Sequence, residues 1–340
     1  MSTRAMDTAI TAMKANQTKL DVISNNIANS STTAFKTSTV NFADTLYQAS
    51  AGASAPTANT GGTNAKEVGL GANISSIDKL MSQGNAEATG RTLDNMIDGD
   101  GYFIVTKGAV DESIPVTTNA LGNGTGVFDT QFTRDGNFHL DEKGNLVTSN
   151  GYRVMGYYSG GTSGTDTPIT GDATTGIISV DETKLADPDT TKFNSGSLNP
   201  LVIPTTVKTS SGTEAVTAFS IGSDGVVTIT TASKKTYAIG QVGMASFTNP
   251  EGLEDTGNNF VTQSTNSGTA LIRSCKTLPS GETDNSGSFG SVKSGYLEAS
   301  NVDLTTEFAN MITTSKSFQA ASKMITNEGD ILDTVIGLVR

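Results

Sequence analysis

The two ends of the chain carry hydrophobic patterns of helical period. Near the N-terminus, steps of four and three positions alternate along one stripe, whose members are Met6, Ile10, Met13, Gln17, Leu20, Ser24 and Ile27. The C-terminal stripe keeps the same alternation for five heptads, through Leu304, Phe308, Met311, Ser315, Phe318, Ser322, Ile325, Gly329, Leu332, Ile336 and Val339. These stripes predict an N-terminal helix within residues 1–34 and a C-terminal helix within residues 294–340.

The two predicted helices are expected to pair. A lone amphipathic helix gains little stability until its apolar stripe is covered, and helices at opposite ends of one chain most simply cover each other. Asn301 or Asp303 is placed to cap the second helix. We therefore expect the termini to lie side by side as a coiled coil.

Between the ends, the signals are those of antiparallel strands. Short apolar runs separated by turns such as Asp135-Gly136 and Asn150-Gly151 predict a middle β domain made of residues 71–158 and 200–293. Residues 35–70 are rich in Ala, Ser, Thr and Gly and are predicted as an extended linker, and residues 159–199 as a small inserted outer module. The predicted fold class is α+β, mainly β, with antiparallel strands flanked by terminal helices.

Composition removes several function classes. The 340 residues carry 22 basic and 34 acidic side chains, a net charge of −12, which repels nucleic acid and anionic lipid. Neither nucleic acid nor a membrane is an expected partner. The chain shows no cleavable signal and no run of apolar residues long enough to span a bilayer. One cysteine excludes an intramolecular disulfide, and one histidine leaves little room for a His/Cys metal cluster.

Few residues suggest chemistry. The glycine-rich stretches at 69–71 and 122–126 lack the spacing of a phosphate-binding loop, and residues 98–101 lack the ligand pattern of a calcium loop. His139 lies in a predicted strand without a distinguishable nucleophile, and Cys275 is interpreted as an inert thiol. We expect no catalytic residue, no metal and no cofactor. An enzyme or a carbohydrate-binding protein on the same β scaffold is the competing class.

Four blocks of motifs occur together. The first is LDVISNNIAN at residues 20–29, followed by TTAFK at 32–36. The second combines Gly84, Asn85, Thr89-Gly90 and Leu93-Asp94 with GDGYF at 99–103. The third is FTRDGNF at 132–138 with GNLV at 144–147 and NGYRV at 150–154, and the fourth is GYLEASNVDL at 295–304. Together they resemble the bacterial flagellar rod and hook proteins.

The resemblance implies a structural subunit that polymerises helically and catalyses nothing. Its terminal helices would form the inner layer of a tube, and the Asn-rich segment after the first helix would shape contacts between copies. The self-assembly residues expected on this basis are Met6, Ile10, Met13, Leu20, Asn25, Asn26, Ile27, Asn29, Phe35, Leu304, Phe308, Met311, Phe318, Ile325 and Leu332.

Within the family, the segment Ser300–Leu304 and the length favour the hook subunit, a flexible universal joint that transmits torque from rod to filament. The distal rod protein is the alternative, because Ala34 stands where glycine is frequent and the outer insertion is small. The resemblance implies export by the flagellar type III apparatus and a location in the extracellular hook of the basal body. Its implied partners are further copies of the chain, the distal rod protein, the hook cap protein and the hook–filament junction protein.

Overall fold

The structure is a computed structural model. It describes residues 2–57, 60–108, 114–117, 120–121, 129–158, 169–171, 178–182, 185, 197–209, 212–273 and 290–338. The glycine-rich stretch 122–126, Cys275, Val339 and most of the predicted outer module 159–199 lie outside the described residues. The chain divides into two compact units. Unit 1 consists of Met1–Ser82 and Ser300–Arg340, and unit 2 of Gln83–Ala299.

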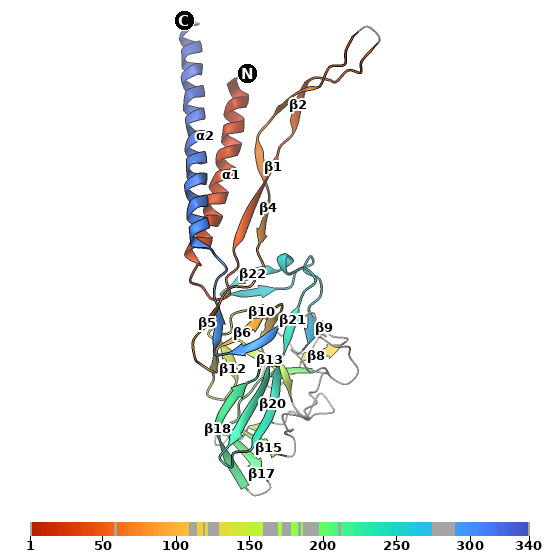
Figure 1. Cartoon of the computed structure of the whole chain (residues 1–340), viewed down its shortest axis with the longest axis vertical. Helices are drawn as coiled ribbons and strands as arrows, with labels where there is room; N and C mark the ends of the chain where they lie inside the picture. The colour runs from red at the N-terminus through yellow and green to blue at the C-terminus, as the bar shows by residue number, and fades with distance from the viewer. Residues whose placement is uncertain are drawn as a thin grey trace. The chain divides into compact units, whose positions relative to one another are not determined.

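Unit 1 contains both helices. Helix α1 spans Ser2–Ala28 and helix α2 spans Leu304–Leu338. They run side by side in opposite directions, so that the two chain ends point the same way (Figure 1). The predicted fold class is confirmed: the chain is mainly β, with a helix at each end and contacts between the two helices.

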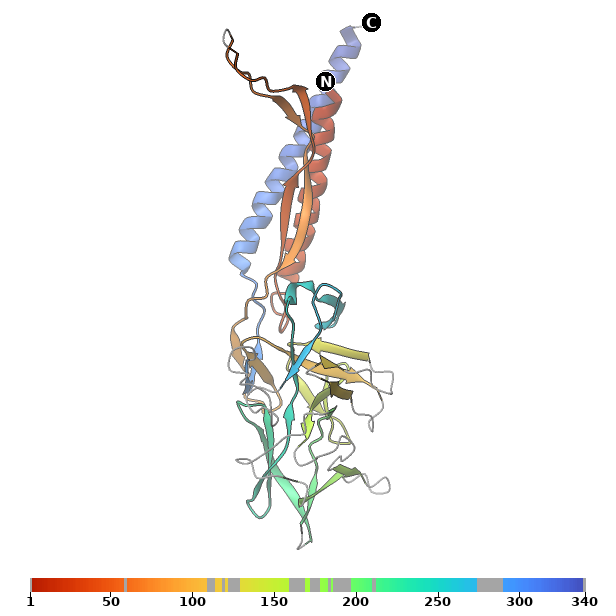
Figure 2. The same cartoon turned by 90° about the vertical axis from the view of Figure 1, so that its right-hand side faces the viewer.

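A long β ribbon completes unit 1. Strand β1 (Ser38–Asp44) pairs antiparallel with β4 (Ala72–Lys79), and β2 (Tyr47–Ala51) pairs with β3 (Lys66–Gly69). Helix α1 contacts both β1 and β4 as well as α2, and the β1–β4 part of the ribbon runs along α1, whereas the β2–β3 part bends away from it (Figure 2). The structure therefore differs from the extended linker predicted for residues 35–70. The sequence pattern did not reveal these strands, because the residues of β1, β2 and β3 are exposed or half-buried on both faces. Such strands lack the clear alternation of apolar and polar residues that marks a strand with one buried face.

Unit 2 is a β structure whose strands are joined mainly by antiparallel pairings. Its first seven strands are β5 (Ala86–Ala88), β6 (Asn95–Asp98), β7 (Tyr102–Lys107), β8 (Ile114–Thr117), β9 (Ala120–Leu121), β10 (Asp129–Thr133) and β11 (Phe138–Leu140). The next eight are β12 (Leu146–Thr148), β13 (Arg153–Tyr158), β14 (Ile169–Gly171), β15 (Ile178–Asp181), β16 (Ser197–Pro200), β17 (Thr206–Thr209), β18 (Gly212–Ile221) and β19 (Val226–Thr231). The remainder are β20 (Thr236–Val242), β21 (Met244–Ser246), β22 (Glu254–Gly257), β23 (Phe260–Thr262), β24 (Leu271–Arg273), β25 (Ser291–Ser294) and β26 (Tyr296–Glu298), with a short 3₁₀ helix at Pro250–Gly252.

Strand β7 lies at the centre of unit 2. It pairs with β10, β13 and β21, and its residues Phe103, Ile104 and Val105 are fully buried. The rings of Phe103 and Phe138 meet edge to face, with centroids 5.1 Å apart. Both hydrophobic core clusters of the described residues belong to unit 2. Burial of these side chains supplies the main favourable term in the stability of unit 2.

The boundaries of unit 2 differ from those predicted for the middle domain. Strand β4 pairs with β1, so residues 72–79 belong to unit 1 although the pattern placed the domain's start at residue 71. At the other end, β25 and β26 pair with β6 and β5, so unit 2 continues to Ala299 instead of ending at residue 293.

Candidate assembly surface

Exposed apolar side chains are concentrated in unit 1. Of the eighteen large hydrophobic residues that the described structure leaves exposed, fifteen lie in this unit. They are Phe42, Leu46, Tyr47, Val68, Leu70, Ile77 and Leu80 on the ribbon and its connections, and Leu304, Phe308, Ile312, Met324, Ile331, Val335, Ile336 and Leu338 on α2. Exposed apolar surface on this scale marks a site of interaction with another macromolecule. We call these fifteen residues the assembly surface.

The fully buried residues of the two helices are mostly small or polar, whereas their larger apolar residues are mostly half-buried or exposed. The buried positions of α2 are Glu307, Thr314 and Ala321, at steps of seven. On α1, the buried hydrophobic residues are Ala9, Ala15 and Ile23. Small side chains let two helices approach closely, but they remove little apolar area from water. Burial of the larger apolar side chains in the helix pair of a single chain is therefore incomplete.

The expected self-assembly residues take up three kinds of position. Leu304 and Phe308 are exposed on α2 and belong to the assembly surface. Asn25 is exposed and Asn26 is buried on α1. The remaining expected residues are half-buried: Met6, Ile10, Met13, Leu20, Ile27, Asn29, Phe35, Met311, Phe318, Ile325 and Leu332. The pattern missed the apolar residues of the ribbon and Ile312, Met324, Ile331 and Val335, which lie off the predicted stripe.

Asn26 fastens α1 to the ribbon. Its side chain is 1% exposed, and its amide makes two bonds to the backbone of Ser38 at the start of β1. The Asn26 Nδ2 group donates to the Ser38 carbonyl at 2.8 Å, and its Oδ1 atom accepts from the Ser38 N–H at 3.1 Å. An amide used in this way imitates a strand neighbour and satisfies both backbone groups of Ser38.

Other polar residues of the first motif block shape the turn after α1. Asn29 donates from Nδ2 to the carbonyl oxygen of Asn25 at 3.0 Å and to its Oδ1 atom at 2.9 Å. The Thr32 hydroxyl donates to Asn29 Oδ1 at 3.1 Å. Ala34 then adopts a left-handed backbone with φ of 57°, which turns the chain toward β1.

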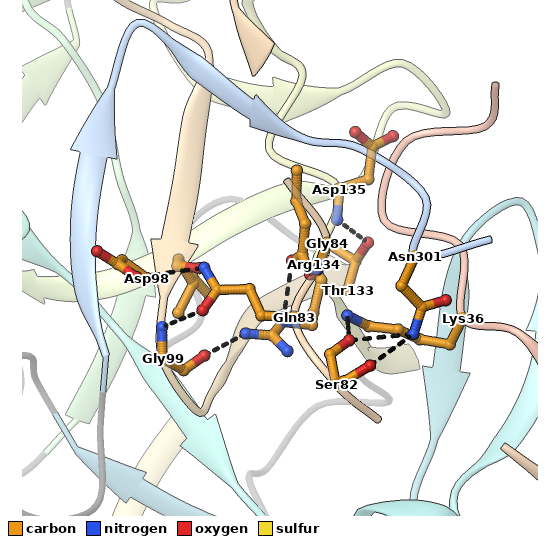
Figure 3. A network of polar contacts seen from close by, with 12 residues as sticks. Lys36, Ser82, Gln83, Gly84, Asp98, Gly99, Thr133, Arg134, Asp135 and Asn301 are labelled. Atoms are coloured by element: carbon orange, nitrogen blue, oxygen red, sulfur yellow. Dashed lines mark hydrogen bonds and ion pairs between the residues drawn. The ribbon is translucent and has the colours of Figure 1, made fainter. Parts of the chain in front are cut away.

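Just before α2, Asn301 links separate stretches of the backbone, as Asn26 does on α1. Its Oδ1 atom accepts from the N–H and the hydroxyl of Thr37, both at 2.8 Å. Its Nδ2 group donates to the carbonyl oxygens of Leu80 at 2.8 Å and Ser82 at 3.1 Å, and Lys36 also reaches the Ser82 carbonyl (Figure 3). Asn301 thus ties together three stretches of unit 1. The sequence had suggested it only as a possible helix cap.

Asp303 caps α2. Its Oδ1 atom accepts from the Thr305 N–H at 2.9 Å and its Oδ2 atom from the Thr306 hydroxyl at 2.8 Å. The bonds from Thr306 and Thr305 hold the pKa of the Asp303 carboxyl below its usual range. Of the two capping candidates, Asp303 is the one that binds the first turn.

The contact between α1 and the ribbon is close. The Lys19 ammonium lies 5.5 Å from the centre of the Phe42 ring on β1. Gly71, with φ of 124°, faces Thr11 so closely that an added Cβ would lie 2.2 Å from the threonine hydroxyl. Glycine is therefore required at this approach. These contacts cover one side of α1, whereas α2 has no comparable cover among the described residues.

Elsewhere among the described residues, the candidate catalytic and metal-binding groups of the sequence form no recognisable site. His139 is exposed on β11 opposite Val147, and residues 98–101 form the turn between β6 and β7. No group of three or more His, Cys, Asp or Glu side chains in the described part of the chain is arranged to hold a metal ion. Among the helices described, none has the length and apolarity needed to cross a membrane.

Comparison with known proteins agrees with the motif blocks. A family model described as "Flagella basal body rod protein" matches residues 6–36, one for the "Flagellar hook protein FlgE/F/G D1 domain" matches 120–229, and one for "Flagellar basal body rod FlgEFG protein C-terminal" matches 293–338. The flagellar basal-body rod protein FlgG of Bacillus subtilis is 39% identical over 337 residues, covering 99% of both chains. The chain belongs to the flagellar rod and hook protein family. Its class is therefore structural, and its location is the flagellum.

Rod and hook members of the family align differently with this chain. FlgG of Agrobacterium fabrum is 31% identical over 337 residues, covering 98% of both chains. The hook protein FlgE of Escherichia coli is 26% identical over 447 positions, covering 98% of this chain and all of the relative. Since this chain has 340 residues, at least 107 of those positions are ones that it does not fill. A solved Helicobacter pylori hook protein, FlgE2, has a TM-score of 0.38 at 10% identity over 63% of this chain and all of that chain.

Proposed function

We propose that this chain is a rod subunit of the flagellar axial structure, of the distal rod type. The support is its end-to-end similarity to rod proteins of nearly equal length, against hook proteins with long additional segments. The segment Ser300–Leu304 and the chain length had both favoured the hook, but the relatives of nearly equal length are rod proteins, so the argument from length is reversed. The length match and Ala34, at a position where glycine is frequent in hook proteins, both favour the rod.

The hook subunit remains the second candidate. It is favoured by Ser300–Leu304, a segment that resembles the lead-in to the C-terminal helix of hook proteins. The two functions make different mechanical demands, because a rod must resist bending whereas a hook must bend on every turn. Both require the same chemistry of self-association.

Self-assembly is carried by the assembly surface of unit 1. The fully buried side chains of the two helices are mostly small or polar, and residues such as Ile312, Ile331 and Leu338 are more than half exposed. Each large apolar side chain that another copy covers contributes about 1.5–3 kcal/mol. A contact between different faces of successive copies does not close on itself and generates a helical filament. We infer that further copies of the chain are its principal partner.

Electron microscopy of basal bodies from a strain that lacks the gene tests the assignment. A rod that stops before its distal segment supports the proposed function. A complete rod that ends without a hook would make the chain the hook subunit. Restoring the gene on a plasmid, and restoring a version with Ile331→Asp, separates loss of the protein from loss of its assembly surface.

A further inference from the structure

The two ends of unit 2 meet in a small ribbon outside its large sheet. Strands β5 and β26 pair over three residues each, with Ala86 opposite Glu298 and Ala88 opposite Tyr296. A two-stranded ribbon of this length has marginal stability in water. Contacts beyond the ribbon must hold it to the rest of unit 2.

A buried ion pair makes those contacts. Glu298 on β26 has a fully buried side chain, and its Oε1 atom accepts from the Gly84 N–H at 3.0 Å. Its Oε2 atom lies 3.3 Å from Nε of Arg134, whose side chain is 6% exposed. The Arg134 guanidinium also donates to the carbonyl oxygen of Gly99 (Figure 3). It lies 5.7 Å from the centre of the Tyr102 ring. One buried carboxylate thus joins both ends of unit 2 to a buried cation.

The cation is fixed to the centre of the sheet. Arg134 follows β10 directly, and β10 pairs with the buried strand β7. The first residue of unit 2 is held in the same region: Gln83 donates from Nε2 to the Ile97 carbonyl at 3.2 Å and accepts at Oε1 from the Gly99 N–H at 3.1 Å. The chain is therefore pinned where it enters unit 2 and again where it leaves.

We propose that Arg134, Glu298 and the Gly84 N–H form a clasp that fastens the β5–β26 ribbon to the core of unit 2. Force that arrives along the chain at either end of the unit passes into the sheet through the clasp and does not peel the ribbon away. The mechanical role rests on the proposed function in a torque-bearing shaft, whereas the clasp itself does not.

Hydrogen exchange of the full-length, unassembled chain tests the clasp. Glu298→Gln keeps an acceptor for Gly84 but leaves Arg134 buried without its counter-charge. We expect the amides of the ribbon, including the Ala299 N–H bonded to Asn85, to exchange about a hundredfold faster. The amides of β7 and β10 should change by less than about threefold.

A neighbouring ion pair provides the matched control. Lys293 and Asp98 lie 2.5 Å apart across β25 and β6, with side chains 46% and 41% exposed. Lys293→Gln should accelerate exchange of the ribbon by less than about fivefold, because exposed pairs contribute little. Equal acceleration in both variants, or unchanged ribbon exchange in Glu298→Gln, would overturn the clasp.

A double variant keeps the test decisive if Glu298→Gln does not fold. Arg134→Met with Glu298→Gln removes the ion pair without leaving a buried charge, so the chain should fold while its ribbon still exchanges at least about tenfold faster than in the wild type. Wild-type protection of the ribbon in this variant would overturn the clasp. A double variant that unfolds, or one whose core exchanges as fast as its ribbon, contradicts the proposal. Normal swimming in viscous medium by Glu298→Gln cells with a loosened ribbon would refute the mechanical role alone, and the gene-deletion experiment tests the proposed function separately.

Discussion

At the residue scale, single asparagine side chains hold unit 1 together. Asn26 is buried and uses both ends of its amide on Ser38, whereas Asn25 is exposed and accepts through Oδ1 from Asn29. Replacement by aspartate should therefore change the free energy of unfolding differently at these two adjacent positions. The motif identified both residues but could not tell which one turned inward.

Asn26→Asp should lower the free energy of unfolding of unit 1 by about 2–4 kcal/mol. The substitution removes the donor to the Ser38 carbonyl and places a charge in a buried position. Asn25→Asp keeps the acceptor that Asn29 uses, so we expect a change below about 0.5 kcal/mol. Urea unfolding followed by circular dichroism at 222 nm measures both. Equal losses in the two variants would contradict the assignment of Asn26 as the fastening.

Ala34→Gly should stabilise the chain. Ala34 has a φ of 57°, where a Cβ atom is crowded, so glycine should gain about 0.5–1 kcal/mol after its larger loss of backbone entropy. Ala28→Gly, at the last residue of α1, is the control, and it should destabilise by up to about 1 kcal/mol. Urea midpoints that move in the same direction for both variants would show that the backbone of Ala34 is not strained.

At the element scale, the sequence predicted both helices, and much of the predicted α2 stripe falls on the half-buried face. The stripe shares Met311, Ser315, Phe318, Ile325, Gly329 and Leu332 with that face. Phe308 and Ser322, which also belong to the stripe, are exposed and lie one residue after the buried positions Glu307 and Ala321. A period analysis follows apolar residues, so it did not indicate the fully buried positions Glu307, Thr314 and Ala321, which are polar or small.

The exposed apolar residues of α2 should be needed for assembly of copies and not for folding of the single chain. Ile331 is 53% exposed, so Ile331→Asp should change the free energy of unfolding of the unassembled chain by less than about 0.5 kcal/mol. It should nevertheless abolish polymerisation and swimming, because the contact between copies would bury a charge. Ile331→Leu keeps the apolar area and should assemble normally. Negative-stain microscopy measures polymerisation, and motility agar measures swimming. Normal polymers of the Ile331→Asp chain would show that this residue does not belong to the assembly surface.

The cap of α2 makes its stability depend on pH. The hydrogen bonds from Thr306 and Thr305 lower the folded-state pKa of Asp303, so the charged carboxylate stabilises the helix above about pH 4. That contribution is lost as the pH falls through the depressed folded-state pKa. Asp303→Ala should therefore lose more helix stability, relative to the wild type, at pH 7 than in strong acid, where the protonated carboxyl is only a neutral acceptor. Asp303→Asn keeps an acceptor without a charge, so its midpoint of thermal unfolding, relative to Asp303→Ala, should stay constant across the same pH range.

At the scale of the whole molecule, the sequence identified the fold class and the family but not the division into units. Helical stripes and Asp-Gly or Asn-Gly turns are local signals, so they located the helices and much of the antiparallel sheet. The pairing of β1 with β4 and of β26 with β5 joins segments far apart in the sequence. Such pairings leave little local pattern where the strands are exposed, as on β5, whose three residues are all exposed. The clasp was missed for the same reason: nothing near Glu298 in the sequence indicates that it meets Arg134.

The division into units predicts which fragment folds. Residues 83–299 contain both core clusters and both partners of the clasp, and lack all fifteen of the exposed apolar residues that we assign to assembly. The fragment should unfold cooperatively and remain monomeric in sedimentation at concentrations at which the full chain associates. A fragment of residues 83–289 loses β25 and β26, and with them the buried Val292 and Glu298. We expect it to lose at least about 3 kcal/mol of stability, because Arg134 stays buried without its partner. If both fragments were equally stable, residues 290–299 would contribute nothing to the stability of unit 2, in keeping with the sequence pattern, which had placed residues 294–299 with the C-terminal helix.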